Sequence, residues 1–140
     1  MARLLGGFRD YYGQADPPDD VIAAAVDRLI GDPATEFLLA GEPAAGVAQV
    51  RFRLSAWTGV EDAWLEDVFV EDDARGRGLG RALVEAAVER ARSRGCARIQ
   101  LDANERNEGA LRLYRALGFE TGSPERWDGG RDLYFTRWLR

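Results

Sequence analysis

The stretch from Val68 to Arg81 constrains this chain more than any other. It holds an apolar run, three acidic residues, and then glycines that alternate with Arg77 and Leu79 before an amphipathic pattern begins. Glycine lets backbone N–H groups approach a ligand and tolerates positive φ, and a helix start adds free N–H groups and a positive dipole end. The stretch therefore predicts a buried strand, a turn, and a glycine-rich loop that forms an anion site suited to phosphate. The alternative is a plain strand-to-helix turn.

The glycine spacing excludes two common nucleotide-binding loops. A dinucleotide fingerprint has the form G-x-G-x-x-G/A, whereas here Gly76 and Gly78 are followed by Gly80, and Arg81 stands at the sixth position. A P-loop ends in G-K-[ST], and the sequence contains no such segment.

Composition excludes several other classes of site. The sequence has no histidine and one cysteine, Cys96, so we expect no catalytic histidine, no metal site and no intrachain disulfide, which fits a reducing, cytoplasmic location. A net charge of −5 argues against a nucleic-acid partner. No apolar run approaches the length of a signal core or a membrane span, so no membrane partner is expected. The length of 140 residues predicts one domain over residues 1–140.

The spacing of apolar residues predicts the order of the elements. Helices are predicted over residues 1–12, from a cap at Asp19 or Asp20 to residue 30, from the glycine loop to about residue 94, and over residues 108–117. Strands are predicted over residues 36–40, 46–54, 64–70 and 98–103, shortly after Phe119, and over residues 131–139. From Ala48 onward the second strand alternates strictly, which predicts one buried and one polar face. This order predicts an α/β (α+β) fold with a mixed sheet and helices on both faces.

Two motifs are similar to those of a known family. Arg75-x-x-Gly78-x-Gly80 resembles the R/Q-x-x-G-x-G/A pyrophosphate loop of the GNAT superfamily of acetyl-CoA-dependent N-acetyltransferases. The segment from Asn107 to Phe119 resembles that family's N-x-x-A-x-x-x-Y-x-x-x-G-F segment. The resemblance covers roughly residue 34 to the C-terminus. It implies acetyl transfer from acetyl-CoA to a primary amine of a small molecule or peptide. It also implies a strand before the first helix. We expect that the sheet lacks this strand or that the sequence begins after it.

The resemblance also implies which residues bind the cofactor. In the family the sheet splays beside the central strand, whose amides pair with the pantetheine arm of CoA, and the glycine loop holds the pyrophosphate. The residues implied in this way are Val68, Phe69, Val70, Arg75, Gly76, Arg77, Gly78, Leu79, Gly80, Arg81, Asn107, Ala110 and Tyr114.

Tyr114 is the candidate general acid. It follows Asn107 by seven residues, or two helical turns, so the two side chains share one helix face. A phenol with a pKa of about 10 can donate a proton to a leaving thiolate, whose thiol has a pKa of about 8.5. The alternative is a ring that only packs in the core.

Glu66 is the candidate base. An alkylamine with a pKa of about 10.4 is almost fully protonated at pH 7, so a proton acceptor is needed. Glu66 lies on the central strand, where burial raises the pKa of a carboxyl, and it is expected to act through a water molecule. Because adjacent strand residues point to opposite faces, Glu66 and Asp67 are not both expected to face the acceptor. The alternative for either carboxylate is an ion pair with Arg51 or Arg53.

A third stretch indicates the acceptor. Trp57-x-Gly59, followed by Leu65-Glu66-Asp67-Val68-Phe69-Val70, is similar to the diamine and polyamine acetyltransferase branch. The resemblance implies substrate contacts from Glu66, Asp67, Trp57 and Trp127, because acidic and aromatic walls suit a polycation.

The sequence leaves two alternative functions open, and it also leaves the oligomeric state open. One is a non-catalytic module of the same fold that binds acyl-CoA as a sensor or interaction domain, and the other is a structural α/β domain that binds no nucleotide. A homodimer is expected, partly from the resemblance and partly because Tyr134, Phe135 and Trp138 offer an apolar edge on the last strand.

Overall fold

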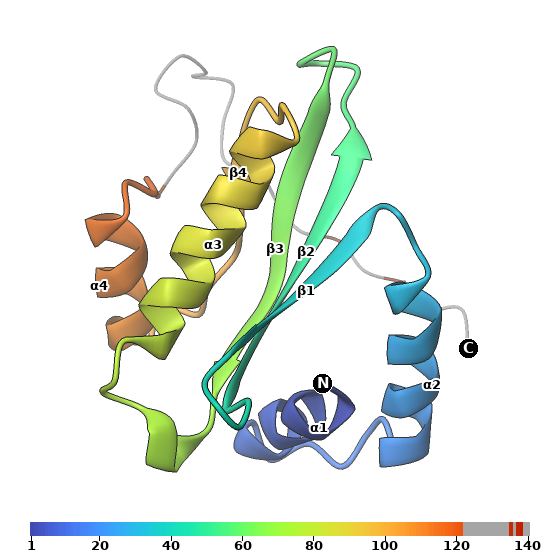
Figure 1. Ribbon diagram of the computed structural model, residues 1–140, viewed down its shortest axis with the longest axis vertical. Helices are drawn as coiled ribbons and strands as arrows, with labels where there is room; N and C mark the ends of the chain where they lie inside the picture. Colours follow the sequence, from blue (N-terminus) through green and yellow to red (C-terminus); the bar gives the residue numbers. More distant parts are fainter. Residues whose placement is uncertain (122–134, 136, 139–140) are drawn as a thin grey trace. The chain divides into compact units, whose positions relative to one another are not determined.

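The computed structural model describes residues 1–121, 135, 137 and 138, and the chain forms two compact units, residues 1–103 and 104–140 (Figure 1). Each unit is described by itself, and the single domain stays a prediction. The first contains α1 (Ala2–Tyr11), α2 (Asp19–Ile30), β1 (Thr35–Ala40), β2 (Gly46–Leu54), β3 (Glu61–Val70), the 3-10 helix η1 (Asp72–Ala74), α3 (Leu79–Ser93) and β4 (Ile99–Gln100). The second contains α4 (Glu108–Ala116).

The sheet is mixed, which confirms the predicted fold class. Its strand order is β1-β2-β3-β4, with two antiparallel pairs followed by a parallel one. No strand precedes α1 in the part of the chain that the structure describes, as expected. β4 pairs with β3 only opposite Ala63 and Trp64. From Leu65 to Val70, β3 therefore has β2 as its only strand neighbour among the described residues, and its other edge is open.

Helices cover both faces of the sheet, as predicted (Figure 1). On one face Leu4 of α1 forms a buried cluster with Val47 and Phe69 of the sheet. On the other face a Cβ placed on Gly46 would lie 3.1 Å from Cδ1 of Leu83 in α3. Because Gly46 and Val47 are adjacent in β2 and point in opposite directions, α1 and α3 lie on opposite faces.

The burial of β2 corrects the predicted alternation. Every residue from Gly46 to Val50 is buried, and Gln49, which the pattern placed on the polar face, is only 8% exposed. The reason is that helices cover both faces of this half of the strand. Leu54, which the pattern placed on the buried face, is 78% exposed at the hairpin end of the strand.

The bounds of two strands also differ from the prediction. β3 begins at Glu61 rather than Trp64, because the ladder with β2 continues to the hairpin. β4 is shorter than residues 98–103, because only two of its residues pair with β3. Residues 119–121 form no strand, and most of the predicted last strand lies outside the described residues.

None of the helices among the described residues has both the length and the apolar character needed to cross a bilayer. A cytoplasmic location stays a prediction, and so does the homodimer. Phe135 and Trp138 are exposed, whereas Tyr134 lies outside the described residues.

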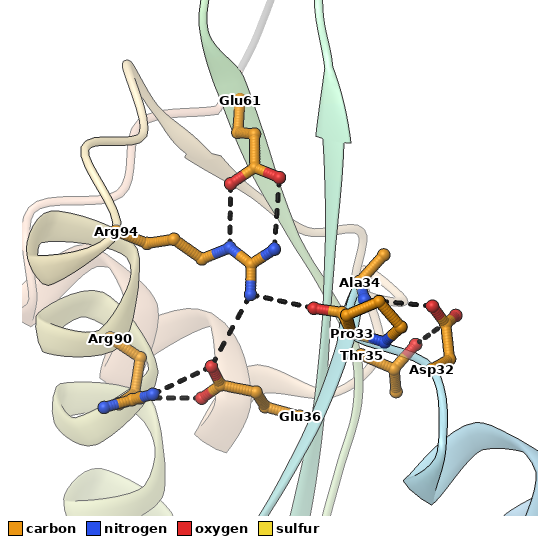
Figure 2. Close-up of polar contacts among 8 residues, drawn as sticks. All are labelled: Asp32, Pro33, Ala34, Thr35, Glu36, Glu61, Arg90 and Arg94. Carbon is orange, nitrogen blue, oxygen red and sulfur yellow. Dashed lines mark hydrogen bonds and ion pairs between the residues drawn. The ribbon is translucent and has the colours of Figure 1, made fainter.

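Ion pairs tie the C-terminal half of α3 to β1 and β3 (Figure 2). Arg94 donates through Nε and Nη2 to the two carboxylate oxygens of Glu61, at 2.7 and 3.1 Å, and through Nη1 to the carbonyl oxygen of Pro33. Arg90 forms the same kind of fork with Glu36, at 2.6 and 2.9 Å. Such two-point pairs are stronger and more specific than single surface ion pairs. They hold the helix that begins at the glycine loop in a fixed position on the sheet.

We expect this network to make the stability of the fold depend on pH. The hydrogen bonds from Arg90 lower the pKa of Glu36, and those from Arg94 lower the pKa of Glu61. A carboxyl with a lowered folded pKa stabilises the fold above its unfolded pKa of about 4.3, and this contribution is lost as pH falls through the folded pKa. The double variant Glu36→Gln, Glu61→Gln should therefore show a flatter fall of Tm below about pH 5 than the wild type.

The measurement is thermal unfolding followed by circular dichroism between neutral and acid pH. Glu89→Gln serves as the control, because its 3.8 Å pair with Arg92 is exposed on both sides, and it should keep the wild-type slope. If the double variant kept the wild-type slope as well, the two forks would not be the source of the acid sensitivity.

Candidate functional site

The glycine-rich loop leads from the end of β3 to the start of α3. Gly76 and Gly78 have φ values of 77° and 76°, which side chains rarely adopt, and a Cβ at either position would meet nothing within 4 Å. Gly78 is the N-cap of α3, whose first turn has neither a capping side-chain bond nor an acidic residue. The N–H groups of Leu79, Gly80 and Arg81 therefore have no intrahelical acceptor. This end of the helix suits an anion.

The three arginines of the loop differ in their contacts. Arg75 donates to the carbonyl oxygen of Val70 at 3.0 Å, and its guanidinium lies 4.6 Å from the ring centroid of Tyr11. Arg81 forms an ion pair within α3. Arg77 has no such partner among the residues that the structure describes. Arg75 therefore fixes the loop against α1, while Arg77 offers its charge to solvent or to a ligand.

The open edge of β3 is followed by the short helix η1 and then by this loop. It includes Val68, Phe69 and Val70, the residues expected to pair with the pantetheine arm. An unpaired strand edge binds an extended chain through main-chain hydrogen bonds. The edge and the loop together fit a ligand with an amide-bearing arm and a pyrophosphate, which is the shape of the cofactor implied by the resemblance. The individual contacts stay predictions.

A cavity of about 520 Å³ lies between α1, α2 and the sheet. Its size is typical of small-molecule sites. Among the described strands, the residues that line it are Gln49 and Asp67. The two helices and the segment between them contribute the remaining wall, which is mainly apolar; examples are Phe8, Val21, Ala25 and Leu29.

An irregularity in the ladder between β2 and β3 decides which carboxylate reaches this cavity. Gln49 pairs with Asp67, and the next residue, Val50, pairs with Leu65, so Glu66 is an extra residue on β3. A β-bulge of this kind interrupts alternation and changes the direction of a side chain. Asp67 is half-buried and lines the cavity, whereas Glu66 is exposed and does not.

The environment of Asp67 favours its protonated form. Burial raises the pKa of Asp67, and the nearby negative charges of Glu66 and Asp102 raise it further. Within the described part of the chain, neither Asp67 nor Gln49 forms a side-chain hydrogen bond or an ion pair. Both groups are therefore free to bind a ligand. Sequence reasoning named Asp67 as a substrate contact but did not single out Gln49. It also did not foresee that Asp67 rather than Glu66 lines the cavity, because no local sequence signal reveals a bulge.

The ion-pair alternative for the two carboxylates is not found. Arg51 lies 3.7 Å from a carboxylate oxygen of Asp32. Arg53 stands over the ring of Trp64, at 5.9 Å from its centroid. Both arginines thus have other contacts.

The structure does not bring Trp57 to the cavity. It lies at the tip of the hairpin between β2 and β3 and is 95% exposed. Glu61, the first residue after this hairpin, is six positions before Asp67 on β3, which is about 20 Å along a strand. Trp127 lies outside the described residues. The substrate-binding roles of Trp57 and Trp127 stay predictions.

The second unit carries the downstream motif on α4. Asn107 accepts a hydrogen bond from the N–H of Ala110 at 3.2 Å, which confirms it as the N-cap. The ring of Tyr114 meets that of Phe119 edge to face, with centroids 5.8 Å apart. Gly118, with φ of 87°, follows the helix end. The cofactor contacts of this unit and the acid role of Tyr114 stay predictions.

Comparison with known proteins gives consistent matches. The model of the acetyltransferase (GNAT) family matches residues 3–119. Thialysine N-epsilon-acetyltransferase of Bos taurus is 34% identical over 82 residues, which are 56% of this chain and 48% of that protein. Streptothricin acetyltransferase of Streptomyces lavendulae is 34% identical over 115 residues, which are 75% of this chain and 59% of that protein. The chain thus spans about half the length of these relatives.

A solved structure extends the match to the whole chain. The crystal structure of a proposed acetyltransferase from Arthrobacter sp. FB24 superposes with a TM-score of 0.84 and 33% identity. It covers 99% of this chain, and the match spans 87% of that chain. The fold described above is therefore the fold of that protein.

Proposed function

Because the chain belongs to the acetyltransferase (GNAT) family, we propose that it transfers an acetyl group from acetyl-CoA to a primary amine of a small-molecule or peptide acceptor. The observation that carries the proposal is the open edge of β3, which continues into the uncapped, glycine-rich start of α3. Diamines and polyamines are the acceptors implied by the resemblance of residues 57–70.

The chemistry sets the tasks of the chain. Acetyl-CoA supplies a thioester whose C–S bond breaks as the C–N bond to the amine forms. The chain must hold both substrates, accept a proton from the ammonium nitrogen, and return one to the sulfur. The backbone of residues 68–70 and 78–81 holds the cofactor, and the hydroxyl of Tyr114 donates the proton to the sulfur.

The proton acceptor is one of two neighbouring carboxylates on β3. Glu66, acting through a water molecule, is the assignment made from the sequence. Asp67 is favoured by its place in the cavity lining and by the raised pKa that burial gives it. A base is most effective when its pKa lies close to the working pH, and the raised pKa moves Asp67 in that direction.

The pH profiles of two variants should identify the base. Without its base, the enzyme depends on amine already deprotonated in solution, so kcat/KM at pH 7 should fall about 10²-fold and recover toward pH 9. We expect this behaviour from Asp67→Asn, while Glu66→Gln stays closer to wild type. In the wild-type pH profile of kcat/KM, the apparent pKa of the acid limb should lie above the ordinary Asp pKa of about 3.9. If Glu66→Gln showed this behaviour and Asp67→Asn did not, Glu66 would be the base.

A thiol-release screen with acetyl-CoA against diamines, polyamines, amino acids and peptide N-termini tests the proposed activity. Release with any primary amine supports it. Retained CoA affinity with no release from the whole panel would favour the non-catalytic acyl-CoA sensor. Absence of thermal stabilisation by CoA would instead favour a structural domain that binds no nucleotide.

A further inference from the structure

The cavity between α1 and α2 has one polar end and otherwise mainly apolar walls. We propose that it is the acceptor site and that it selects a primary amine on a compact apolar body over a diamine or polyamine. The inference rests on the proposed acetyl transfer and names the class of its acceptor.

The polar end is the pair formed by Gln49 and Asp67. They stand directly opposite each other in the ladder, so their side chains point to the same face of the sheet. Gln49 is only 8% exposed and forms no side-chain hydrogen bond within the described part of the chain. No fully buried side-chain nitrogen or oxygen of the described residues lacks a partner. The unbonded amide of Gln49 is therefore accessible from the cavity, where it can bind a ligand or water. A carboxylate and an amide oxygen are suitable acceptors for the three N–H donors of a primary ammonium group.

The rest of the lining does not suit a second ammonium group. The side chains of Phe8, Val21, Ala25 and Leu29 present carbon to the cavity, and burying an unpaired charge against carbon is strongly unfavourable. Arg9 also lines the cavity, but its charge is already paired and offers no site for a second ammonium group.

Arg9 is held in place by its own partners. It forms ion pairs with Asp10 at 2.6 Å and Asp19 at 2.8 Å, and it donates to the carbonyl oxygen of Pro17. The other carboxylate of the lining is Asp16, which is exposed in the segment between the helices. Asp67 is therefore the only partly buried carboxylate that the described lining offers to a cation.

The position of the polar end also fits the reaction. Asp67 immediately precedes Val68, the first of the residues on the open edge of β3 expected to pair with the cofactor arm. An amine bound at Asp67 therefore lies beside the strand edge along which the thioester is expected to lie. The apolar body of the acceptor then extends between α1 and α2.

The first test compares acceptors. The probes are 2-phenylethylamine and hexylamine on one side, and 1,4-diaminobutane and spermidine on the other, in the thiol-release assay with acetyl-CoA. We expect kcat/KM for the apolar amines to exceed that of the diamine by at least about 10-fold, which is the usual discrimination of an apolar pocket. A preference for 1,4-diaminobutane or spermidine would overturn the inference and leave the proposed acetyl transfer intact.

The second test blocks the cavity. Ala25→Phe places a ring in the cavity from an exposed position on α2, whereas Ala24→Phe places the same ring on that helix outside the lining. Binding of 2-phenylethylamine, measured by calorimetry, should weaken at least about 10-fold in the first variant and stay near wild type in the second. CoA affinity should be unchanged in both. Equal amine affinity of Ala25→Phe and wild type would overturn the inference.

The same titration separates the inference from the proposed function. If 2-phenylethylamine binds and Ala25→Phe blocks it, yet no amine is acetylated, the binding site is supported and acetyl transfer is refuted. If amines are acetylated but 2-phenylethylamine neither binds nor reacts, the proposed function stands and the choice of an apolar acceptor is overturned. Asp67→Asn should weaken binding about 10-fold or more, because it removes a charged hydrogen-bond acceptor.

Discussion

Tyr114→Phe is expected to lower turnover by about 10²–10⁴-fold, the usual contribution of a general acid. The substitution removes only the hydroxyl and keeps the ring that meets Phe119 at 5.8 Å, so the fold of α4 should be unchanged. The measurement is kcat by thiol release at saturating acetyl-CoA with the best amine. CoA affinity, measured by calorimetry, should change far less, because most of the binding is expected from the backbone of residues 68–81.

Phe119→Leu is the matched control. It removes the partner ring of Tyr114 but leaves the hydroxyl, so it should lower the Tm more than it lowers turnover. If Tyr114→Phe stayed within a few-fold of wild type, Tyr114 would be a packing residue, and the thiolate would take its proton from water.

Gly80→Val is expected to weaken CoA binding by about 10²-fold or more, the loss of one to two hydrogen bonds to a charged group. Gly80 is the second residue of α3, in the uncapped first turn whose N–H groups are expected to bind the pyrophosphate. A branched side chain here occupies the space in which the phosphate oxygens must approach. The measurement is calorimetric titration with CoA on protein whose fold has been checked by circular dichroism.

Ala86→Val provides the comparison for this variant. It puts the same β-branched residue at an exposed position of the same helix without approaching the loop. It lowers helix propensity, which Gly80→Val does not, because glycine is a poorer helix former than valine. CoA affinity should stay near wild type. Unchanged affinity in a folded Gly80→Val protein would count against the whole assignment of the cofactor site to the glycine loop.

The conformation of the glycine loop could be predicted from the sequence because its signal is local. Gly76 and Gly78 adopt the left-handed conformation that only glycine adopts easily, and their spacing to Arg75 is visible without a structure. The cap of α4 was predicted for the same reason, since Asn107 bonds a residue three positions along.

The surroundings of Glu66, Asp67 and Gln49 depend on long-range pairing and could not be predicted in the same way. Alternation along β3 placed Glu66 and Asp67 on opposite faces, and Glu66 was predicted to be the base. The register against β2 makes Glu66 the extra residue of a bulge, and Asp67 is the carboxylate that lines the cavity. Likewise, the polar character of Gln49 indicated a solvent-exposed face, but helices packed from elsewhere in the chain bury it.

The short pairing of β4 with β3 has a consequence for the tendency of the protein to aggregate in solution. A strand edge that stays open inside a sheet can pair with a strand of another chain. Aggregation of many proteins begins with such pairing. A bound cofactor arm would cover that edge and, by mass action, favour the folded state. Storage with CoA should therefore keep the protein dispersed for longer than storage without it, even where no acceptor is present and nothing is being acetylated.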